Sequence, residues 1–159
     1  DYMSSSNALN LIYNSMLISL CSFLETRLGL LCKLIENRET ESLKNIIGTS
    51  TLVKFKNYLS EVHSIDFNSI NSEWEQIFAY AYLRNKLVHN HSPKINIKTN
   101  PDGYSELKKI KFLYLDDKSE INKIYINDPR ILEEYFDLIS RILNFIVTIK
   151  VDYKDLIKN

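Results

Sequence analysis

Two long segments of the chain carry apolar residues at helical spacing. The first runs from about Ser6 to Glu36, and the second begins at Asp128 and Pro129, a pair suited to the cap and first turn of a helix. In both segments an apolar side chain returns every three or four positions, which places these side chains on one side of a helix. The apolar band of the second segment is too broad for one neighbour. We therefore predict two long amphipathic helices, the last packing on the first and contributing to a dimer.

The stretch from Ser72 to Pro93, SEWEQIFAYAYLRNKLVHNHSP, predicts a central helix. Ser72 and Glu75 have the spacing of a capping box, in which each side chain accepts a hydrogen bond from the other residue's backbone N–H group. Between Ile77 and Leu83 the segment is apolar on nearly every side, which is typical of a helix that other elements surround. Pro93 cannot continue a helix, so we expect the helix to end a few residues before it.

After Pro93 the apolar period changes to two, the period of a strand. Isoleucines alternate with polar residues at 95–97, an Asn-Pro-Asp-Gly turn signal follows at 100–103, and alternation returns at 110–114 and 121–126. Shorter helices are predicted before Gly48 and after a cap at Ser50 or Thr51. The predicted fold is an all-α helical bundle with a small antiparallel β extension at about 94–126, in one domain spanning 1–159.

Composition and charge narrow the class of protein. The chain has 159 residues, 45% of them hydrophobic, enough for one domain with a substantial core. Lys plus Arg equals Asp plus Glu at 20 each, so any nucleic-acid site must be local. No window of eighteen uncharged apolar residues occurs and no secretion signal opens the chain, which predicts a cytoplasmic protein without a membrane partner. Cys21 and Cys32 are expected to be buried free thiols rather than metal ligands.

The polar end of the central helix carries the candidate chemistry. The string RNKLVHN contains Arg84, Asn85 and, after three further residues, His89. This motif resembles the arginine, polar residue, three variable residues, histidine signature of the HEPN superfamily. The resemblance implies an all-helical domain that pairs as a dimer and places the motif at a helix end lining the dimer cleft. Many HEPN domains are metal-independent endoribonucleases of toxin–antitoxin, phage-defence and RNA-processing systems, and others have lost catalysis. A subgroup that partners nucleotidyltransferases has tyrosine where this chain has His91, which argues against that subgroup.

The three motif residues fit the chemistry of RNA cleavage. The 2′-hydroxyl of RNA is an internal nucleophile, so an enzyme needs a base for its proton, in-line placement of the phosphate and positive charge near the phosphorane. Histidine gains and loses a proton near neutral pH, and arginine meets two phosphate oxygens with a planar fork. Two-fold pairing would supply both an acid and a base from His89. The expected products carry 2′,3′-cyclic phosphate and 5′-hydroxyl ends, and no metal or other cofactor is required.

Other residues are candidates for support or for RNA binding. Glu25 either meets Arg84 or His89 through a charge-assisted hydrogen bond or is a solvated charge on the first helix. Tyr80 and His91, the neighbours of the motif, are further supporting candidates. The candidate RNA-binding residues are lysines in and after the motif, with Tyr104 and Tyr114 as stacking surface: Lys86, Lys94, Lys108, Lys109 and Lys111. Lysines in a sheet also guard an edge strand from aggregation, and that alternative stays open.

Two readings compete with a ribonuclease. In one, the chain is a catalytically inactive HEPN-like module that binds RNA, a nucleotide or a partner protein. In the other, Arg84 and His89 only satisfy polar groups at a helix end. The position of the motif at the end of the most apolar helix, between long first and last helices, favours the ribonuclease. Its expected partners are an RNA substrate, a second copy of the chain, and an antitoxin or other regulatory protein.

Overall fold

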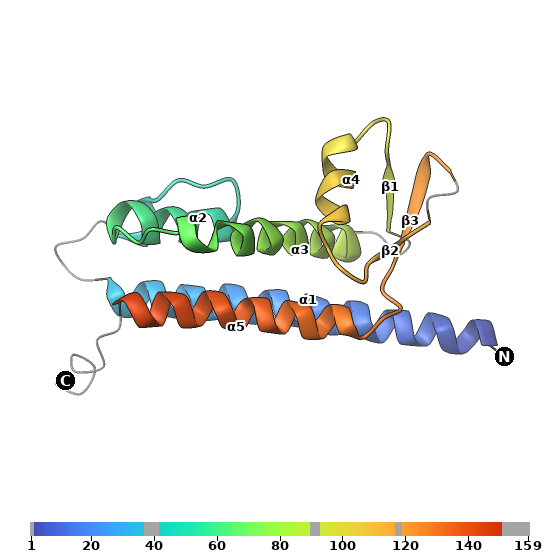
Figure 1. Cartoon of the computed structure of the whole chain (residues 1–159), viewed down its shortest axis with the longest axis horizontal. Coiled ribbons are helices and arrows are strands. Elements are labelled where there is room, and N and C mark those ends of the chain that lie inside the picture. Colours follow the sequence, from blue (N-terminus) through green and yellow to red (C-terminus); the bar gives the residue numbers. More distant parts are fainter. Residues whose placement is uncertain (1, 37–41, 90–92, 117–118, 151–159) are drawn as a thin grey trace. The chain divides into compact units, whose positions relative to one another are not determined.

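The computed structural model describes residues 2–36, 42–89, 93–116 and 119–150 (Figure 1). The described chain is mostly helical with a small antiparallel sheet, and this part of the fold prediction is confirmed. The α-helices are α1 (Tyr2–Ile35), α2 (Thr51–Asn57), α3 (Asn71–His89), α4 (Pro101–Lys108) and α5 (Arg130–Lys150). Short 3-10 turns at Leu43–Asn45 and Asn68–Ile70 and a π turn at Tyr58–Val62 join them. The strands are β1 (Lys94–Asn96), β2 (Tyr114–Leu115) and β3 (Ile121–Tyr125).

The chain divides into two compact units. Unit 1 comprises Asp1–Ser22 and Glu75–Leu138, and unit 2 comprises Phe23–Trp74 and Ile139–Asn159. The helices α1, α3 and α5 each contribute residues to both units. The sheet, α4 and the RNKLVH motif belong to unit 1.

Unit 2 is built around aromatic side chains. Trp74 is fully buried, and its ring meets Phe67 edge-on with 5.3 Å between the ring centroids. The Phe67 ring also lies 6.0 Å from that of Phe145 on α5. A Cβ atom on Gly29 would lie 3.3 Å from the Phe55 ring, so the absence of a side chain at 29 lets α1 approach α2 closely.

The helix α3 begins differently from the prediction. It starts at Asn71, directly after the 3-10 turn Asn68–Ile70, so Ser72 is already inside the helix. The Ser72 hydroxyl donates to the Glu73 carboxylate at 2.8 Å. The predicted capping box of Ser72 with Glu75 is therefore wrong, because a 3-10 turn supplies the start of the helix instead. Of the two predicted candidates for the cap of α2, Ser50 and Thr51, the structure has Ser50, whose hydroxyl accepts from the Val53 N–H at 3.3 Å.

In unit 1, a pair of stacked tyrosines joins α3 to α5. The rings of Tyr80 and Tyr135 lie 4.0 Å apart at an interplanar angle of 19°. The Tyr80 hydroxyl also donates to the backbone oxygen of Ile131 at 3.4 Å. Tyr135 is fully buried, and only 3% of Tyr80 is exposed. The apolar half of α3 is therefore held inside the protein, as the sequence predicts.

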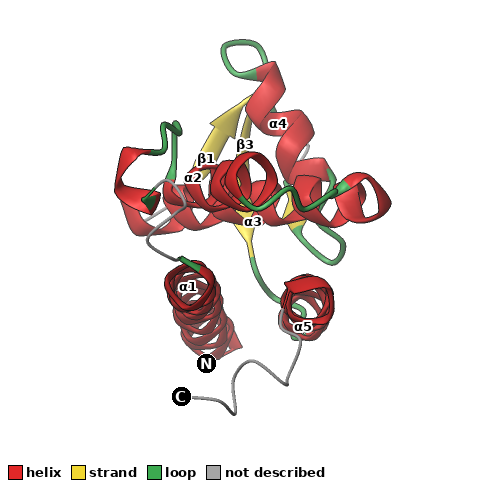
Figure 2. Cartoon of the chain, turned by 90° about the vertical axis from the view of Figure 1, so that its left-hand side faces the viewer, coloured by secondary structure: helices red, strands yellow, loops and turns green. Residues whose placement is uncertain are grey.

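The sheet has the strand order β1-β3-β2, so β3 lies in the centre with an antiparallel neighbour on each side. Figure 2 shows β1 and β3 side by side. Successive side chains of a strand point to opposite faces. One face of the sheet is buried and carries Ile95, Leu115, Asn122 and Ile124. On the opposite face Lys94 is paired with Lys123, and Tyr114 with Tyr125.

The turn predicted at 100–103 is instead the start of the helix α4, which lies beside β1 (Figure 1). Asn100 caps it, because its Oδ1 accepts from the Gly103 N–H at 3.0 Å, and Pro101 occupies the first turn. The Asn100 amide also donates to the Tyr82 hydroxyl at 2.9 Å. Lys108 and Lys109 accordingly lie at the end of a helix and not on a strand. The error arose because Asn-Pro-Asp favours a helix start as strongly as a turn.

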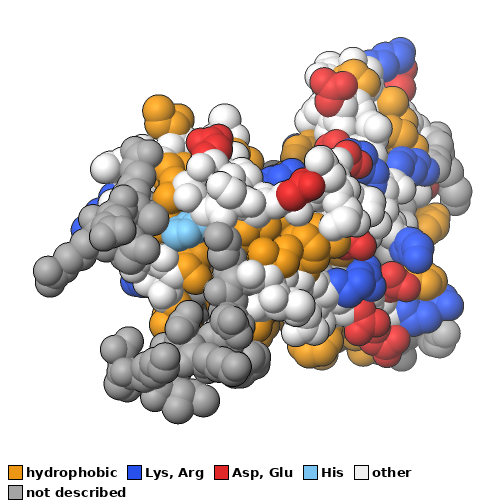
Figure 3. All heavy atoms as spheres, turned by 60° about the vertical axis from the view of Figure 1, so that its left-hand side comes forward, with side chains coloured by type: hydrophobic (Ala, Val, Ile, Leu, Met, Phe, Trp, Pro, Cys, Tyr) orange, Lys and Arg blue, Asp and Glu red, His pale blue; other side chains and the backbone are white. Residues whose placement is uncertain are grey.

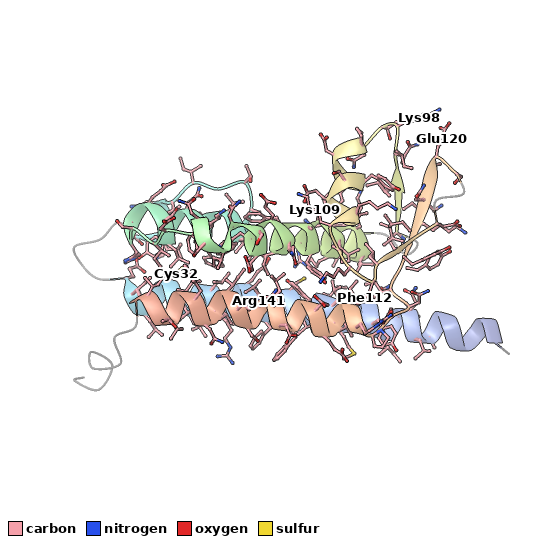
Figure 4. The ribbon with its side chains drawn as sticks, viewed as in Figure 1. Cys32, Lys98, Lys109, Phe112, Glu120 and Arg141 are labelled. Carbon is pink, nitrogen blue, oxygen red and sulfur yellow. The ribbon has the colours of Figure 1, made fainter. Side chains whose placement is uncertain are left out.

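The predicted strand at 110–114 is also shorter than expected. Phe112 has a φ of 62°, a left-handed conformation that ends any extended run. The Arg130 guanidinium lies over the Phe112 ring, 4.2 Å from the ring centroid. Phe112 is labelled near the start of α5 in Figure 4. Only Tyr114 and Leu115 remain as strand β2.

The two cysteines are buried and free, as predicted. Burial raises the pKa of the Cys32 thiol to about 12, with a smaller contribution from the Glu36 carboxylate. Within Ala8–Ile35 of α1 an eighteen-residue window has a mean hydropathy of 1.4, so this helix is long and apolar enough to cross a membrane, a property that core helices of soluble proteins and signal sequences share.

Replacing the cap of α4 is expected to destabilise unit 1. We predict that Asn100→Ala lowers the free energy of unfolding by about 1 kcal/mol or more, since the helix loses its cap and Tyr82 loses a hydrogen bond. Urea denaturation followed by circular dichroism measures this change. Tyr82→Phe removes only the hydrogen bond between the side chains and should cost less. An unchanged Asn100→Ala protein would contradict the capping role.

Removing one of the facing lysines is expected to stabilise the protein. Like charges directly opposite each other on neighbouring strands repel. We predict that Lys123→Gln raises the free energy of unfolding by about 0.2 to 1 kcal/mol at low salt, and that the gain fades at high salt as the charges are screened. Thermal denaturation at two salt concentrations measures it, with Lys44→Gln in unit 2 as the control. A loss of stability at low salt would show that Lys123 is held by a favourable contact.

Candidate active site

The RNKLVH motif occupies the last turns of α3, which ends at His89. Arg84 is partly buried, whereas Asn85 and His89 are exposed. The sequence predicts an end of the helix at about His89 to His91; α3 is described as far as His89, and residues 90–92 lie outside the described part of the chain. His91 lies outside the described residues. The motif therefore stands where an apolar, enclosed helix reaches the surface.

Arg84 is held by its neighbour in the sequence. One terminal nitrogen of its guanidinium, Nη1, donates to the Oδ1 atom of Asn85 at 3.1 Å. Its Nε atom is buried and has no hydrogen-bond partner in the described part of the chain. A buried N–H group without a partner costs free energy and marks a position that calls for an explanation. Asn85 thus orients a guanidinium whose Nε donor is not used by any described residue.

His89 and Asn85 lie on the same side of the helix. Four residues of an α-helix turn through about 40° beyond a full turn and rise about 6 Å. Arg84 and His89 are five residues apart, about 140° around the axis and roughly 7.5 Å along it. Within one chain, Arg84 forms a hydrogen bond with Asn85. Asn85 and His89 lie on the same face of the helix. The described structure contains no hydrogen bond between Arg84 and His89.

The candidate supporting residues separate into different environments. Tyr80 is part of the buried stack with Tyr135, and burial raises the pKa of its phenol, with a further contribution from the Glu134 carboxylate. Its hydroxyl is occupied by the backbone of α5, so Tyr80 acts on the motif by fixing α3. Glu25 belongs to unit 2, where it lines a pocket with Gly29 and Phe55. Its contact with Arg84 or His89 stays a prediction.

Acidic residues neutralise several of the candidate RNA-binding lysines. Lys109 forms an ion pair with Glu106 at 2.7 Å, and that hydrogen bond raises the pKa of Lys109. Lys111 lies 3.6 Å from the carboxylate of Glu134. On the face of the molecule in Figure 3, basic and acidic side chains are interspersed, in keeping with a net charge of zero.

The remaining candidate lysines differ in their surroundings. The ammonium groups of Lys86 and Lys108 lie over the rings of Tyr82 and Tyr104, at 5.4 Å and 5.2 Å from the ring centroids. Lys94 is exposed on β1 and has no ion pair with a described residue. Of the five lysines, Lys94 is thus the most available to an anionic ligand.

Two residues of the same surface were missed by sequence reasoning. Lys123 and Tyr125 lie on β3, opposite Lys94 and Tyr114. The alternation in Ile121–Tyr125 places positions 121, 123 and 125 on one side of the strand, a signal that was present in the sequence. The order β1-β3-β2, which brings them to Lys94 and Tyr114, is set by non-local pairing.

No cluster of three or more His, Cys, Asp or Glu residues suited to a metal ion occurs among the described residues. No protein-family model matches the chain, and neither a curated protein nor a solved structure resembles it at a significant level.

The role of Tyr80 can be separated into its ring and its hydroxyl. We predict that Tyr80→Phe lowers the free energy of unfolding by about 1 kcal/mol or less, because the 3.4 Å hydrogen bond to Ile131 is lost while the stack on Tyr135 remains. Tyr80→Leu, which removes the stack, should cost more. Urea denaturation of both variants measures the difference. Equal losses would assign the stabilisation to the hydroxyl.

Proposed function

We propose that this chain is a metal-independent endoribonuclease of the HEPN type, with Arg84, Asn85 and His89 as its catalytic residues. The observation that carries the proposal is the arrangement at the end of α3. A partly buried guanidinium, oriented by Asn85 at 3.1 Å, lies within two helical turns of an exposed imidazole. A fixed positive charge beside a group that exchanges protons near neutral pH is the pair that phosphodiester transfer requires.

In the proposed reaction the RNA supplies its own nucleophile. An imidazole takes the proton of the 2′-hydroxyl as that oxygen forms a bond to phosphorus. The bond from phosphorus to the 5′-oxygen breaks, and a protonated imidazole gives its proton to the departing oxygen. Arg84 donates hydrogen bonds to the non-bridging oxygens while negative charge builds on them. The products have a 2′,3′-cyclic phosphate end and a 5′-hydroxyl end.

A second copy of the chain completes this site. One motif provides a single imidazole, and helix geometry separates it from Arg84 by about 140°. Two-fold pairing at the end of α3 would bring two Arg84 and two His89 side chains to one phosphate, so that one imidazole serves as base and the other as acid. The proposal therefore includes a homodimer. A toxin or phage-defence nuclease in the cytoplasm, restrained by an antitoxin or similar protein, is the setting that fits such an activity.

Substitution of the imidazole tests the reaction. We expect His89→Ala to lower the rate of RNA cleavage by a factor of about 10² to 10⁴, the usual contribution of a general acid or base. The assay contains EDTA and identifies the cyclic phosphate product. Lys44→Gln in unit 2 is the control variant, and circular dichroism with size-exclusion light scattering checks the fold and the dimer.

The outcomes separate the competing functions. Equal cleavage by wild type and His89→Ala, or complete loss of cleavage in EDTA, would remove the proposed reaction. If the wild type cuts no RNA and Arg84→Lys weakens its binding to RNA, a nucleotide or a protein, the chain is the non-catalytic module. Growth arrest on expression, relieved by His89→Ala, would support the nuclease inside cells.

A further inference from the structure

The exposed face of the sheet in unit 1 carries two lysines and two tyrosines, which we call the lysine–tyrosine face. Its members are Lys94 on β1, Lys123 and Tyr125 on β3, and Tyr114 on β2. The two lysines are opposite each other in the register, and so are the two tyrosines. The strand β1 begins five residues after His89, in the same unit as the motif.

The two lysines are not explained by protection of a sheet edge. Lysines guard edge strands, and Lys94 lies on the edge strand β1, but Lys123 lies on the central strand β3. Their mutual repulsion lowers the stability of the sheet. Neither lysine forms an ion pair with a described residue. Asp116 lies opposite Lys123 where the pairing of β2 with β3 continues, and its backbone N–H donates to the Lys123 carbonyl at 3.1 Å. An anionic ligand would relieve this repulsion.

Three other lysines between β1 and α5 have carboxylate partners, in contrast to Lys94 and Lys123. Lys98 is paired with Glu120 where the loops after β1 and before β3 meet (Figure 4). Lys109 and Lys111 are paired with Glu106 and Glu134. Lys98, Lys109 and Lys111 thus each form an ion pair with a carboxylate, while Lys94 and Lys123 form none with a described residue.

The tyrosines provide a flat surface beside these charges. The rings of Tyr114 and Tyr125 lie 6.0 Å apart at an interplanar angle of 41°, and 48% of Tyr114 is exposed. Along β3, Tyr125 follows Lys123 by two residues, roughly 7 Å. A base can therefore stack on a tyrosine while a neighbouring phosphate meets a lysine. Stacking on aromatic rings and contact of lysines with phosphates are the two interactions that hold single-stranded nucleic acid.

We propose that the lysine–tyrosine face binds unpaired RNA and so selects single-stranded segments as the substrate of the adjacent motif. In a duplex the bases are stacked on each other, and their faces are closed to the tyrosines. The inference rests on the proposed function in assigning RNA as the ligand. The residues of the lysine–tyrosine face are different from the proposed catalytic residues, and none of them takes part in the proposed cleavage reaction.

Binding is measured in the His89→Ala protein, so that cleavage does not interfere. The probe is a fluorescently labelled twelve-nucleotide RNA of mixed sequence, free or annealed to its complement, and the readout is fluorescence anisotropy. We expect the single strand to bind at least tenfold more tightly than the duplex. Tyr114→Leu should weaken single-strand binding about fivefold or more, and Tyr114→Phe should restore it, because the stacking ring returns.

Salt dependence tests the lysines separately. Each phosphate contact to a single strand contributes about 0.7 to the slope of log affinity against log salt. Lys94→Gln combined with Lys123→Gln should therefore reduce the slope by about 1.4. The matched control is Lys33→Gln combined with Lys44→Gln, which removes the same charge from unit 2 and should leave the slope unchanged.

The failures of the two proposals are distinguishable. If the wild type cleaves RNA through His89 but the sheet variants bind as the control does, the lysine–tyrosine face is overturned and the nuclease stands. Equal affinity for single strand and duplex would also overturn it. If no cleavage occurs but the variants lose single-strand binding as described, the face is supported and the nuclease is rejected.

Discussion

The stack of Tyr80 on Tyr135 is the contact on which the candidate site depends. It buries two large rings between α3 and α5 inside unit 1 and occupies the Tyr80 hydroxyl with backbone. Arg84 follows Tyr80 by four residues, about one turn of the same helix. Any rotation of α3 about its axis would break the stack and turn the guanidinium with it. The orientation of the motif is therefore fixed by core packing one turn before it, and Asn85 supplies the final adjustment.

The sequence predicted what depends on local periodicity. The long first helix, the apolar central helix ending after the motif, and the last helix beginning near Pro129 all follow from the spacing of apolar residues and from caps. The prediction was wrong where the same sequence pattern is compatible with two kinds of local structure. Asn100-Pro101 begins a helix here, and the alternation at 110–114 is cut short by the left-handed Phe112.

In the candidate site, too, the contacts between residues close in sequence could be predicted and those between distant segments could not. Arg84 and Asn85 are adjacent in sequence, so their hydrogen bond could be expected from helix geometry alone. Lys123 and Tyr125 escaped notice because their neighbours on the exposed face come from β1 and β2, and only the pairing order brings them together. Pairing between segments distant in sequence depends on tertiary packing, which local propensity does not encode. The composite site that we propose between two copies would depend on association as well as on folding.

Gly103 limits which side chains can occupy the neighbouring positions 82 and 100. A Cβ atom at that position would lie 2.1 Å from the Tyr82 hydroxyl oxygen and 2.6 Å from the Asn100 side-chain oxygen. The glycine thus makes room for a phenol from another helix, which itself accepts a hydrogen bond from Asn100. In a protein with this fold, a larger residue at 103 would require changes at both 82 and 100. The three positions should consequently change together in evolution, although 82 and 103 are 21 residues apart in the chain.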